Sequence, residues 1–193
     1  MRIHGEVNII RRTNVDQEND YHKYEGALSE DFGHICGYCG KSELVTSKGF
    51  EIDHFVPVRI ASERETDYSN LVYSCFTCNR KKSKKWPTED KDINHNGQVG
   101  FIDPATDEYD EHLSRTEVGD IVGVTDVGIY MCKKAFKFSV RPIKEIWTCT
   151  KILEKQAVLE KRMESMTPEE CKEYIAINQQ IKELYKILFK KKE

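Results

Sequence analysis

Hydrophobic and polar positions alternate in two short stretches of the first half of the chain. Residues 50–56 (FEIDHFV) alternate and are rich in aromatic and β-branched side chains, and residues 71–74 are a second apolar run. Both patterns predict strands. The polar stretch 59–69 between them predicts a loop. From Cys78 no helix-breaking residue occurs before Pro87, which predicts a helix after the second strand.

Apolar residues recur every three or four positions in the last third of the chain. Thr167, Pro168 and Glu170 supply an N-cap threonine, a proline at the first helical position and a glutamate at the third, which is a capping box. An apolar seam follows, formed by Cys171, Tyr174, Asn178, Ile181, Tyr185 and Leu188. Residues 143–165 have a similar spacing, so we expect two helices in an antiparallel hairpin. The seam fits the core of this hairpin, and an interface with a partner is the alternative.

Turn residues and composition divide the chain into four segments. We expect an N-terminal lead-in (1–32) with a short helix at 20–28, a core (33–86), a mixed extension (87–140) and a helical hairpin (141–193). The extension begins as a loop marked by proline, asparagine and glycine, and continues as a small β-hairpin with a short helix. The predicted fold class is therefore α+β.

Composition excludes some classes of protein. The chain of 193 residues has a net charge of −3, no apolar run long enough to cross a membrane, and no signal-peptide core near Met1. Its seven cysteines are an odd number, which fits a reducing compartment better than a disulfide framework. We expect a cytoplasmic protein without a membrane partner.

Local charge is more informative than the total. Five of the six residues 80–85 are basic, namely Arg80, Lys81, Lys82, Lys84 and Lys85. Such a run can contact the phosphates of a nucleic acid, although it is also common on a solvated helix face. Residues 103–126 hold eight acidic residues and one basic residue, a net charge of −7.

Two CxxC pairs flank the predicted strands. Cys36 and Cys39 form the first pair, Cys75 and Cys78 form the second, and 35 residues separate the pairs. Four thiolates with this spacing can surround one Zn²⁺ tetrahedrally. A unit this small buries too little surface to fold without such a cross-link. We therefore expect a structural zinc site made of four cysteines, and a zinc ribbon with no catalytic role is the alternative.

An Asp-His pair lies between the two CxxC pairs. Histidine titrates near neutrality, which suits His54 to take a proton from water, although a lone strand histidine is more often a packing residue. Neighbouring strand residues point to opposite faces, so Asp53 can bind a hard cation independently. Asn79 follows Cys78 and offers a second oxygen ligand. One carboxylate, one amide oxygen and several waters suit Mg²⁺, with Mn²⁺ as a substitute.

In this order, the motifs resemble those of the HNH endonucleases. The chain contains CxxC, then DHxxP beginning at Asp53, then Asn70-Leu, then CxxCN ending at Asn79, followed by basic residues. The resemblance covers residues 33–86 and is closest to the zinc-containing branch with two CxxC pairs. The last letter of the motif is often histidine, and the asparagine found here is common in that branch.

The resemblance implies a fold and a set of roles. The fold is a ββα-metal (His-Me) finger, here stapled by the zinc site and followed by the extension and the helical hairpin. His54 is the general base, Asp53 and Asn79 hold the catalytic cation, and Asn70 fixes the loop that aims His54. Asn70 can also be explained as a turn cap. The basic run 80–85 is expected to contact DNA.

The resemblance also implies hydrolysis of DNA phosphodiesters with one divalent cation, leaving 5′-phosphate and 3′-hydroxyl ends. One alternative is a nuclease subunit of a phage-defence or restriction system, controlled by a partner such as an ATPase that docks on the acidic segment or the hairpin. The other alternative is a zinc-dependent nucleic-acid-binding module that does not cleave. His95 and His112 are expected at the surface, with contact to substrate as the alternative.

Overall fold

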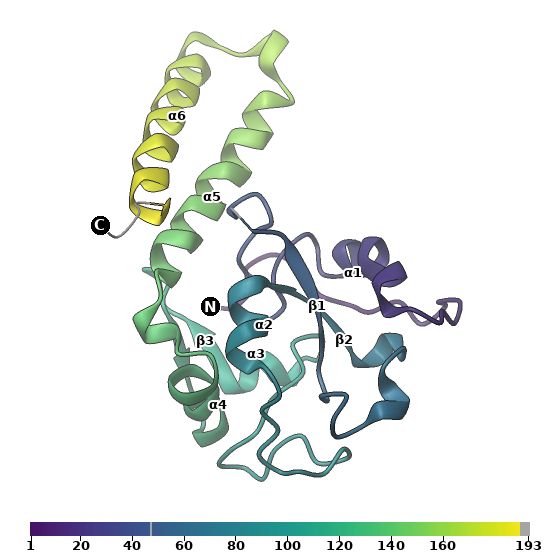
Figure 1. Cartoon of the computed structure of the whole chain (residues 1–193). Helices are drawn as coiled ribbons and strands as arrows, with labels where there is room; N and C mark the ends of the chain where they lie inside the picture. Colours follow the sequence, from purple (N-terminus) through teal and green to yellow (C-terminus); the bar gives the residue numbers. More distant parts are fainter. Residues whose placement is uncertain (47, 190–193) are drawn as a thin grey trace.

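The computed structural model describes residues 1–46 and 48–189, and only the backbone of residues 187–189. Residues 190–193 of the expected hairpin, and the side chain of Leu188 in its seam, lie outside the described residues. The described part has the predicted α+β fold: a finger of two strands and a helix, a small β extension, and two long C-terminal helices (Figure 1).

The finger consists of strands β1 (Phe50–His54) and β2 (Leu71–Cys75) and helix α2 (Phe76–Lys82), which follows β2 directly. The strands pair antiparallel, with Asp53 opposite Val72. All five residues of β2 are buried, while the last residue of β1 stays partly exposed. Both predicted strands are confirmed. The loop expected between them contains only two short 3-10 turns.

Helix α2 is shorter than its sequence pattern predicts. It ends at Lys82, and Ser83 adopts a left-handed conformation with φ 51°. The chain turns away here and buries Trp86, whose ring packs on those of Phe55 and Phe101 with centroids 5.3 and 5.9 Å apart. The prediction of one helix up to residue 86 is wrong in its last turn, because this aromatic packing requires the chain to leave the helix axis.

A short helical segment packs on the finger from the N-terminal side. Asp20 caps a 3-10 turn (Tyr21–Tyr24), which leads directly into helix α1 (Glu25–Asp31). Leu28 of α1 is fully buried, and the helix contacts β2. The short helix expected at residues 20–28 is confirmed, although it extends further.

The extension after the finger begins with a loop, residues 87–100, that has no helix or strand. After this loop, the extension contains helix α3 (Glu108–His112), strand β3 (Leu113–Arg115), strand β4 (Ile121–Gly123) and helix α4 (Asp126–Tyr130), which continues as a π-helical turn (Met131–Ala135). Strands β3 and β4 pair antiparallel. The expected loop, β-hairpin and short helix are therefore all present.

One buried core joins the lead-in, the finger and the extension. Arg115 lies within it, with only 2% of its surface exposed. Its guanidinium donates hydrogen bonds to the carbonyl oxygens of Ile3, Cys39 and Gly119, at 2.7–2.9 Å. Burial of the guanidinium lowers the pKa of Arg115 to about 10. These bonds connect the N-terminus, the first CxxC turn and the β-hairpin.

Helices α5 (Ile143–Glu160) and α6 (Pro168–Phe189) form an antiparallel hairpin that projects from the rest of the molecule (Figure 1). The capping box is confirmed. The amide of Glu170 donates to Oγ1 of Thr167 at 3.2 Å, and the amide of Thr167 donates to Oε2 of Glu170 at 2.8 Å. None of the described helices is both long and apolar enough to cross a lipid bilayer.

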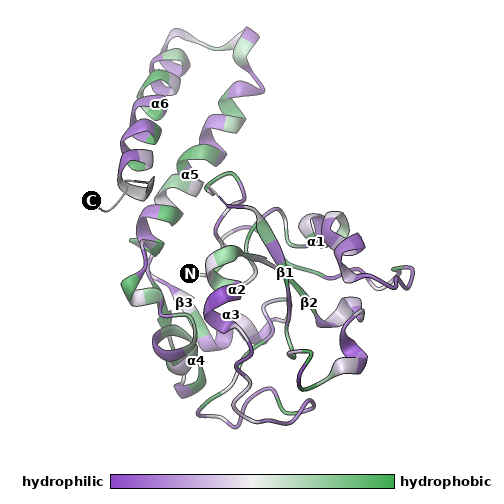
Figure 2. Ribbon diagram, viewed as in Figure 1, coloured by the Kyte–Doolittle hydropathy of each residue, from purple (hydrophilic) through white to green (hydrophobic). Residues whose placement is uncertain are grey.

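The hairpin has a small core of its own, separate from the main one. Its buried residues are Leu159, Ile177 and Ile181. Hydrophobic and hydrophilic residues are interspersed along both helices (Figure 2). The amide of Gln156 on α5 donates to Oδ1 of Asn178 on α6 at 3.2 Å, so the asparagine of the seam joins the two helices. The predicted seam is wrong at Cys171, which is exposed, because the buried face of α6 begins at Tyr174.

Candidate active site and metal centres

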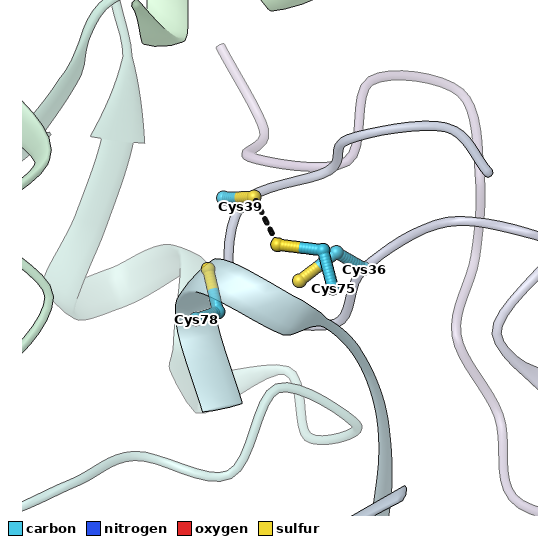
Figure 3. Close-up of side chains that lie close together, drawn as sticks. All are labelled: Cys36, Cys39, Cys75 and Cys78. Carbon is cyan, nitrogen blue, oxygen red and sulfur yellow. Dashed lines mark hydrogen bonds between the residues drawn. The ribbon is translucent and has the colours of Figure 1, made fainter. Parts of the chain in front are cut away.

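The four cysteines of the CxxC pairs converge (Figure 3). All four are buried, and their sulfur atoms lie within 4.8 Å of one another. The Sγ atoms of Cys39 and Cys75 are 3.9 Å apart. Zn–S bonds of about 2.3 Å around a tetrahedral ion place sulfur atoms about 3.8 Å apart. The arrangement fits a structural zinc site, and the predicted grouping of Cys36, Cys39, Cys75 and Cys78 is confirmed.

Arg141 lies beside this cluster, a contact that nothing in the sequence pattern indicates. Its Nη1 and Nη2 atoms each donate to Sγ of Cys78 at 3.4 Å. Burial alone would lower the pKa of Arg141, but the negative charge of Cys78 and its neighbours raises it. With Zn²⁺ bound, the four thiolates would leave an excess of negative charge, which this guanidinium would partly neutralise.

His54 lies at the end of β1 with its ring half-buried. Its Nε2 is 2.8 Å from the carbonyl oxygen of Glu65, and its ring meets that of Tyr21 edge-on at 4.7 Å between centroids. A carbonyl oxygen only accepts hydrogen bonds, so Nε2 carries the proton. In the neutral ring the basic lone pair is therefore on Nδ1.

Asn70 closes the loop between the strands. It is buried, and its Oδ1 accepts from the amide of Val56 at 2.8 Å. Its Nδ2 donates to the carbonyl oxygens of Val56 at 3.0 Å and Arg64 at 3.3 Å. The loop that Asn70 ties together carries Glu65, whose carbonyl holds His54. These contacts suit a residue that positions the histidine.

Asp53 points into the finger and is held by two donors. Its Oδ2 accepts from the hydroxyl of Tyr38 at 2.5 Å and from Nζ of Lys82 at 3.0 Å. Burial raises the pKa of Asp53, and the ammonium of Lys82 and the hydroxyl of Tyr38 oppose that rise. Both contacts fall on Oδ2, and among the described residues none donates to Oδ1. Oδ1 of Asp53 is therefore the carboxylate oxygen that these contacts leave unused.

The position of Lys82 corrects one prediction. We expected it to contact the DNA backbone together with the rest of the basic run, but its side chain is 0% exposed. Besides pairing with Asp53, it donates to the carbonyl oxygen of His54 at 2.7 Å. Lys82 is the last residue of α2 and faces β1, so it is a buried counter-ion of the site and is not available to phosphates.

Asn79 lies in α2 beside Glu51, a residue that we did not predict in the site. Nδ2 of Asn79 donates to Oε2 of Glu51 at 2.6 Å, which leaves the amide oxygen of Asn79 for another partner. Arg80 approaches Oε1 of the same carboxylate at 3.3 Å. Glu51 could have been found from strand alternation, because it lies two residues before Asp53 and so shares its face of β1.

Three of the four predicted catalytic residues share one open cavity of about 280 Å³, which Asn70 does not line. Asp53, His54 and Asn79 all line it, together with Arg59 and Lys84. A neighbouring hollow of the same size is lined by Glu51, Asn79 and Arg80 among others. The finger therefore places a histidine, a carboxylate, an amide and basic side chains around a common space.

Among the remaining members of the basic run, Lys84 lines this cavity and Arg80 lines the neighbouring hollow, whereas Lys81 and Lys85 line neither. Arg80, Lys84 and Lys85 are exposed and Lys81 is partly exposed. The end of α2 that carries Arg80 and Lys81 is strongly hydrophilic (Figure 2). Partial burial lowers the pKa of Lys85, and the like charges of Lys137 and Lys81 lower it further, so cations crowd together at this point.

Residues 36–85 match a family model described as HNH endonuclease. No curated protein matches the chain. The match spans all four cysteines, the Asp-His pair and both motif asparagines, and it confirms the resemblance inferred from the sequence. This part of the chain is an HNH endonuclease domain, and such a domain supports nuclease activity in general.

Proposed function

We propose that the chain is a metal-dependent DNA endonuclease in which His54 is the general base. The observation that carries the proposal is the hydrogen bond from Nε2 of His54 to the carbonyl oxygen of Glu65. It leaves Nδ1 as the basic nitrogen of a side chain that lines the same cavity as Asp53 and Asn79. A base fixed in one tautomer beside oxygen donors is what activation of water requires.

Asp53 and Asn79 are the proposed holders of the catalytic cation. Oδ1 of Asp53 and the amide oxygen of Asn79 are hard donors that suit Mg²⁺, or Mn²⁺ in its place. The hydrogen bond from Nδ2 of Asn79 to Glu51 sets which way that amide faces. When bound, the cation supplies charge that stabilises the developing negative charge on the phosphate.

The proposed reaction is hydrolysis of one phosphodiester bond. Water gives a proton to Nδ1 of His54 while its oxygen bonds to phosphorus, and the bond from phosphorus to O3′ breaks. O3′ then takes a proton, so the products are a 5′-phosphate and a 3′-hydroxyl, as the family resemblance implies. Arg80, Lys81, Lys84 and Lys85 are the proposed contacts to the DNA backbone.

A second candidate is a nuclease subunit controlled by a protein partner in a phage-defence or restriction system. The observation in its favour is the projecting hairpin, which exposes more than half of the surface of Val158, Met163 and Ile175. Self-association through the same surface is a further form of this proposal. A cytoplasmic location fits either role.

The test is cleavage of supercoiled plasmid by the purified full chain with Mg²⁺ or Mn²⁺. We predict that His54→Ala slows cleavage by about 10²–10⁴ and leaves zinc content and melting temperature nearly unchanged, because a general base contributes to the barrier and little to the fold. His34→Asn is the control, since His34 is an exposed histidine that lines neither hollow, and asparagine tolerates its left-handed backbone at φ 59°.

Each outcome separates the candidates. Cleavage by His54→Ala at the wild-type rate would show that the base lies elsewhere. A wild-type chain that cleaves only with an added partner would favour the controlled subunit. A chain that binds DNA and never cleaves under any condition would favour a binding module.

A further inference from the structure

A second group of metal-ligating side chains lies on the extension, apart from the four cysteines and the candidate active site. It consists of His95 in the loop 87–100 and of Glu108 and His112 on α3. One ligand atom from each lies within 4.8 Å of the others. Glu108 and His112 are four residues apart on one helix, so both face the same side. The β-bridge between His95 and Gly100 closes the part of the loop that carries His95.

The distances within this group are those of ligands that share an ion. Nε2 of His95 and Nε2 of His112 are each 3.3 Å from Oε1 of Glu108. Zinc bonds of about 2.0–2.2 Å at a tetrahedral ion place nitrogen and oxygen ligands about 3.3–3.5 Å apart. A charge-assisted hydrogen bond between the same groups would be shorter, about 2.7–2.9 Å. The four-cysteine site shows the same agreement with zinc geometry.

His112 is already held in the orientation that a ligand needs. Its Nδ1 lies 2.6 Å from Oγ1 of Thr125, and Oγ1 also accepts from the amide of Gly128 as the N-cap of α4. With Nδ1–H donating to this oxygen, the free lone pair is on Nε2, which faces Glu108. A second hydrogen bond of this kind typically orients a metal-binding histidine.

His95 needs a small adjustment to bind through Nε2. Its Nδ1 accepts from the amide of Gly97 at 3.2 Å, and that contact is given up when Nδ1 carries the proton of the neutral ring. The rings of His95 and His112 are 5.5 Å apart between centroids, close enough to converge on one ion.

Two glycines fix the backbone beneath both histidines. A Cβ atom at Gly128 would lie 1.9 Å from the carbonyl oxygen of His112, and one at Gly100 would lie 2.4 Å from Cα of His95. Only glycine permits this close approach. The histidines are therefore positioned by the packing of the extension itself, so part of the entropy of forming a site is already lost on folding.

We propose that His95, Glu108 and His112 bind a second zinc ion, which fastens the loop 87–100 to helix α3. Two imidazoles and one carboxylate suit Zn²⁺ better than Mg²⁺, which prefers oxygen ligands alone. With three protein ligands the fourth position is open to water, because Glu108 is exposed. The inference does not depend on the proposed nuclease activity.

The number of zinc ions bound by the full chain tests the proposed second zinc site. Wild-type protein, loaded with zinc and dialysed against a fixed low concentration of free zinc, should hold about two zinc ions per chain by elemental analysis. Glu108→Gln and His112→Gln should each hold about one, while the control Glu111→Gln on the same helix should keep two. Zinc should also slow proteolysis within residues 87–100 of the wild type and have no such effect in Glu108→Gln.

Several results would overturn the proposal. A wild-type chain that holds one zinc at every free zinc concentration would reduce the group to a hydrogen-bonded cluster, and so would variants that keep two. If a variant failed to fold, calorimetric titration of the wild-type protein decides. With Mg²⁺ in excess, so that the proposed catalytic cation site is filled, titration with zinc must still show a second binding event besides that of the four cysteines. None of these readouts uses DNA cleavage, so they stand or fall separately from the proposed function.

Discussion

At the scale of single residues, the buried pair of Asp53 and Lys82 has the clearest energetic consequence. Lys82 is wholly buried and its Nζ is 3.0 Å from Asp53. Removing one partner of such a pair leaves an uncompensated charge in the core, at a cost of about 3–5 kcal/mol. We predict that Lys82→Met lowers the free energy of unfolding of the zinc-loaded protein by about this amount in urea. Lys84→Met, which removes an exposed ammonium, should change it by less than about 0.5 kcal/mol.

The variant Lys82→Met should also change the pH dependence of cleavage. Burial raises the pKa of Asp53 and the ammonium of Lys82 opposes this rise, so loss of the ammonium raises the pKa further. A protonated carboxyl group is a poor cation ligand. If Asp53 holds the catalytic cation, the acid limb of the rate profile should move to higher pH in Lys82→Met. An acid limb that does not move would argue against Asp53 as a ligand.

At the scale of elements, the early end of α2 decides which basic residues face the substrate. The helix stops at Lys82 and the chain turns at Ser83, so Lys84 and Lys85 lie beyond the helix and Lys81 lies on its outer side. The proposed DNA-binding surface is therefore formed partly by a helix end and partly by a turn.

We predict that replacing Lys81, Lys84 and Lys85 together by alanine weakens binding to DNA about equally for all sequences. It should also reduce the slope of log K against log salt by about 0.9 for each phosphate that the variant no longer neutralises, because fewer counterions are released. Binding isotherms at several salt concentrations measure this slope. The control removes the same charge from α6 by replacing Lys172, Lys182 and Lys186. An equal effect of both triple variants would mean that only net charge matters.

At the scale of the whole molecule, the described residues form two hydrophobic cores. The main core extends from Ile3 to Ile143 and includes the four-cysteine cluster, while the hairpin core is small and lies between α5 and α6. Damage to the hairpin should therefore leave the catalytic part of the molecule intact.

We predict that Ile177→Asp unfolds the hairpin, because it places a charge in a core of only a few residues. The helical circular dichroism should fall, while zinc content and the cleavage rate of the isolated chain remain. Ile175→Asp is the control, since Ile175 is 59% exposed on the same helix. Loss of zinc from Ile177→Asp would show that the two cores depend on each other.

Patterns among residues close in the sequence were sufficient to predict much of the secondary structure of this protein and its cysteine cluster. Strand alternation, turn residues and the capping box predicted β1, β2 and α6, because these signals depend on neighbours within a few positions of the chain. The spacing of the CxxC pairs predicted the cysteine cluster for a related reason: the geometry of a tetrahedral ion limits which ligand patterns can close around it. The residue types of the candidate active site, a histidine beside side chains with oxygen atoms, could likewise be predicted from the sequence around His54.

Only the tertiary structure decided which side chains meet across long separations. Burial of Trp86 ended α2 early, the fold turned Lys82 inward to Asp53, and Arg141 reached the cluster from 63 positions beyond Cys78. His95 and His112 looked like separate surface residues and became neighbours through a loop and a helix end. Sequence spacing carries no information about such contacts, because packing of the whole core determines them and a residue's type alone does not show which face of the fold it will occupy.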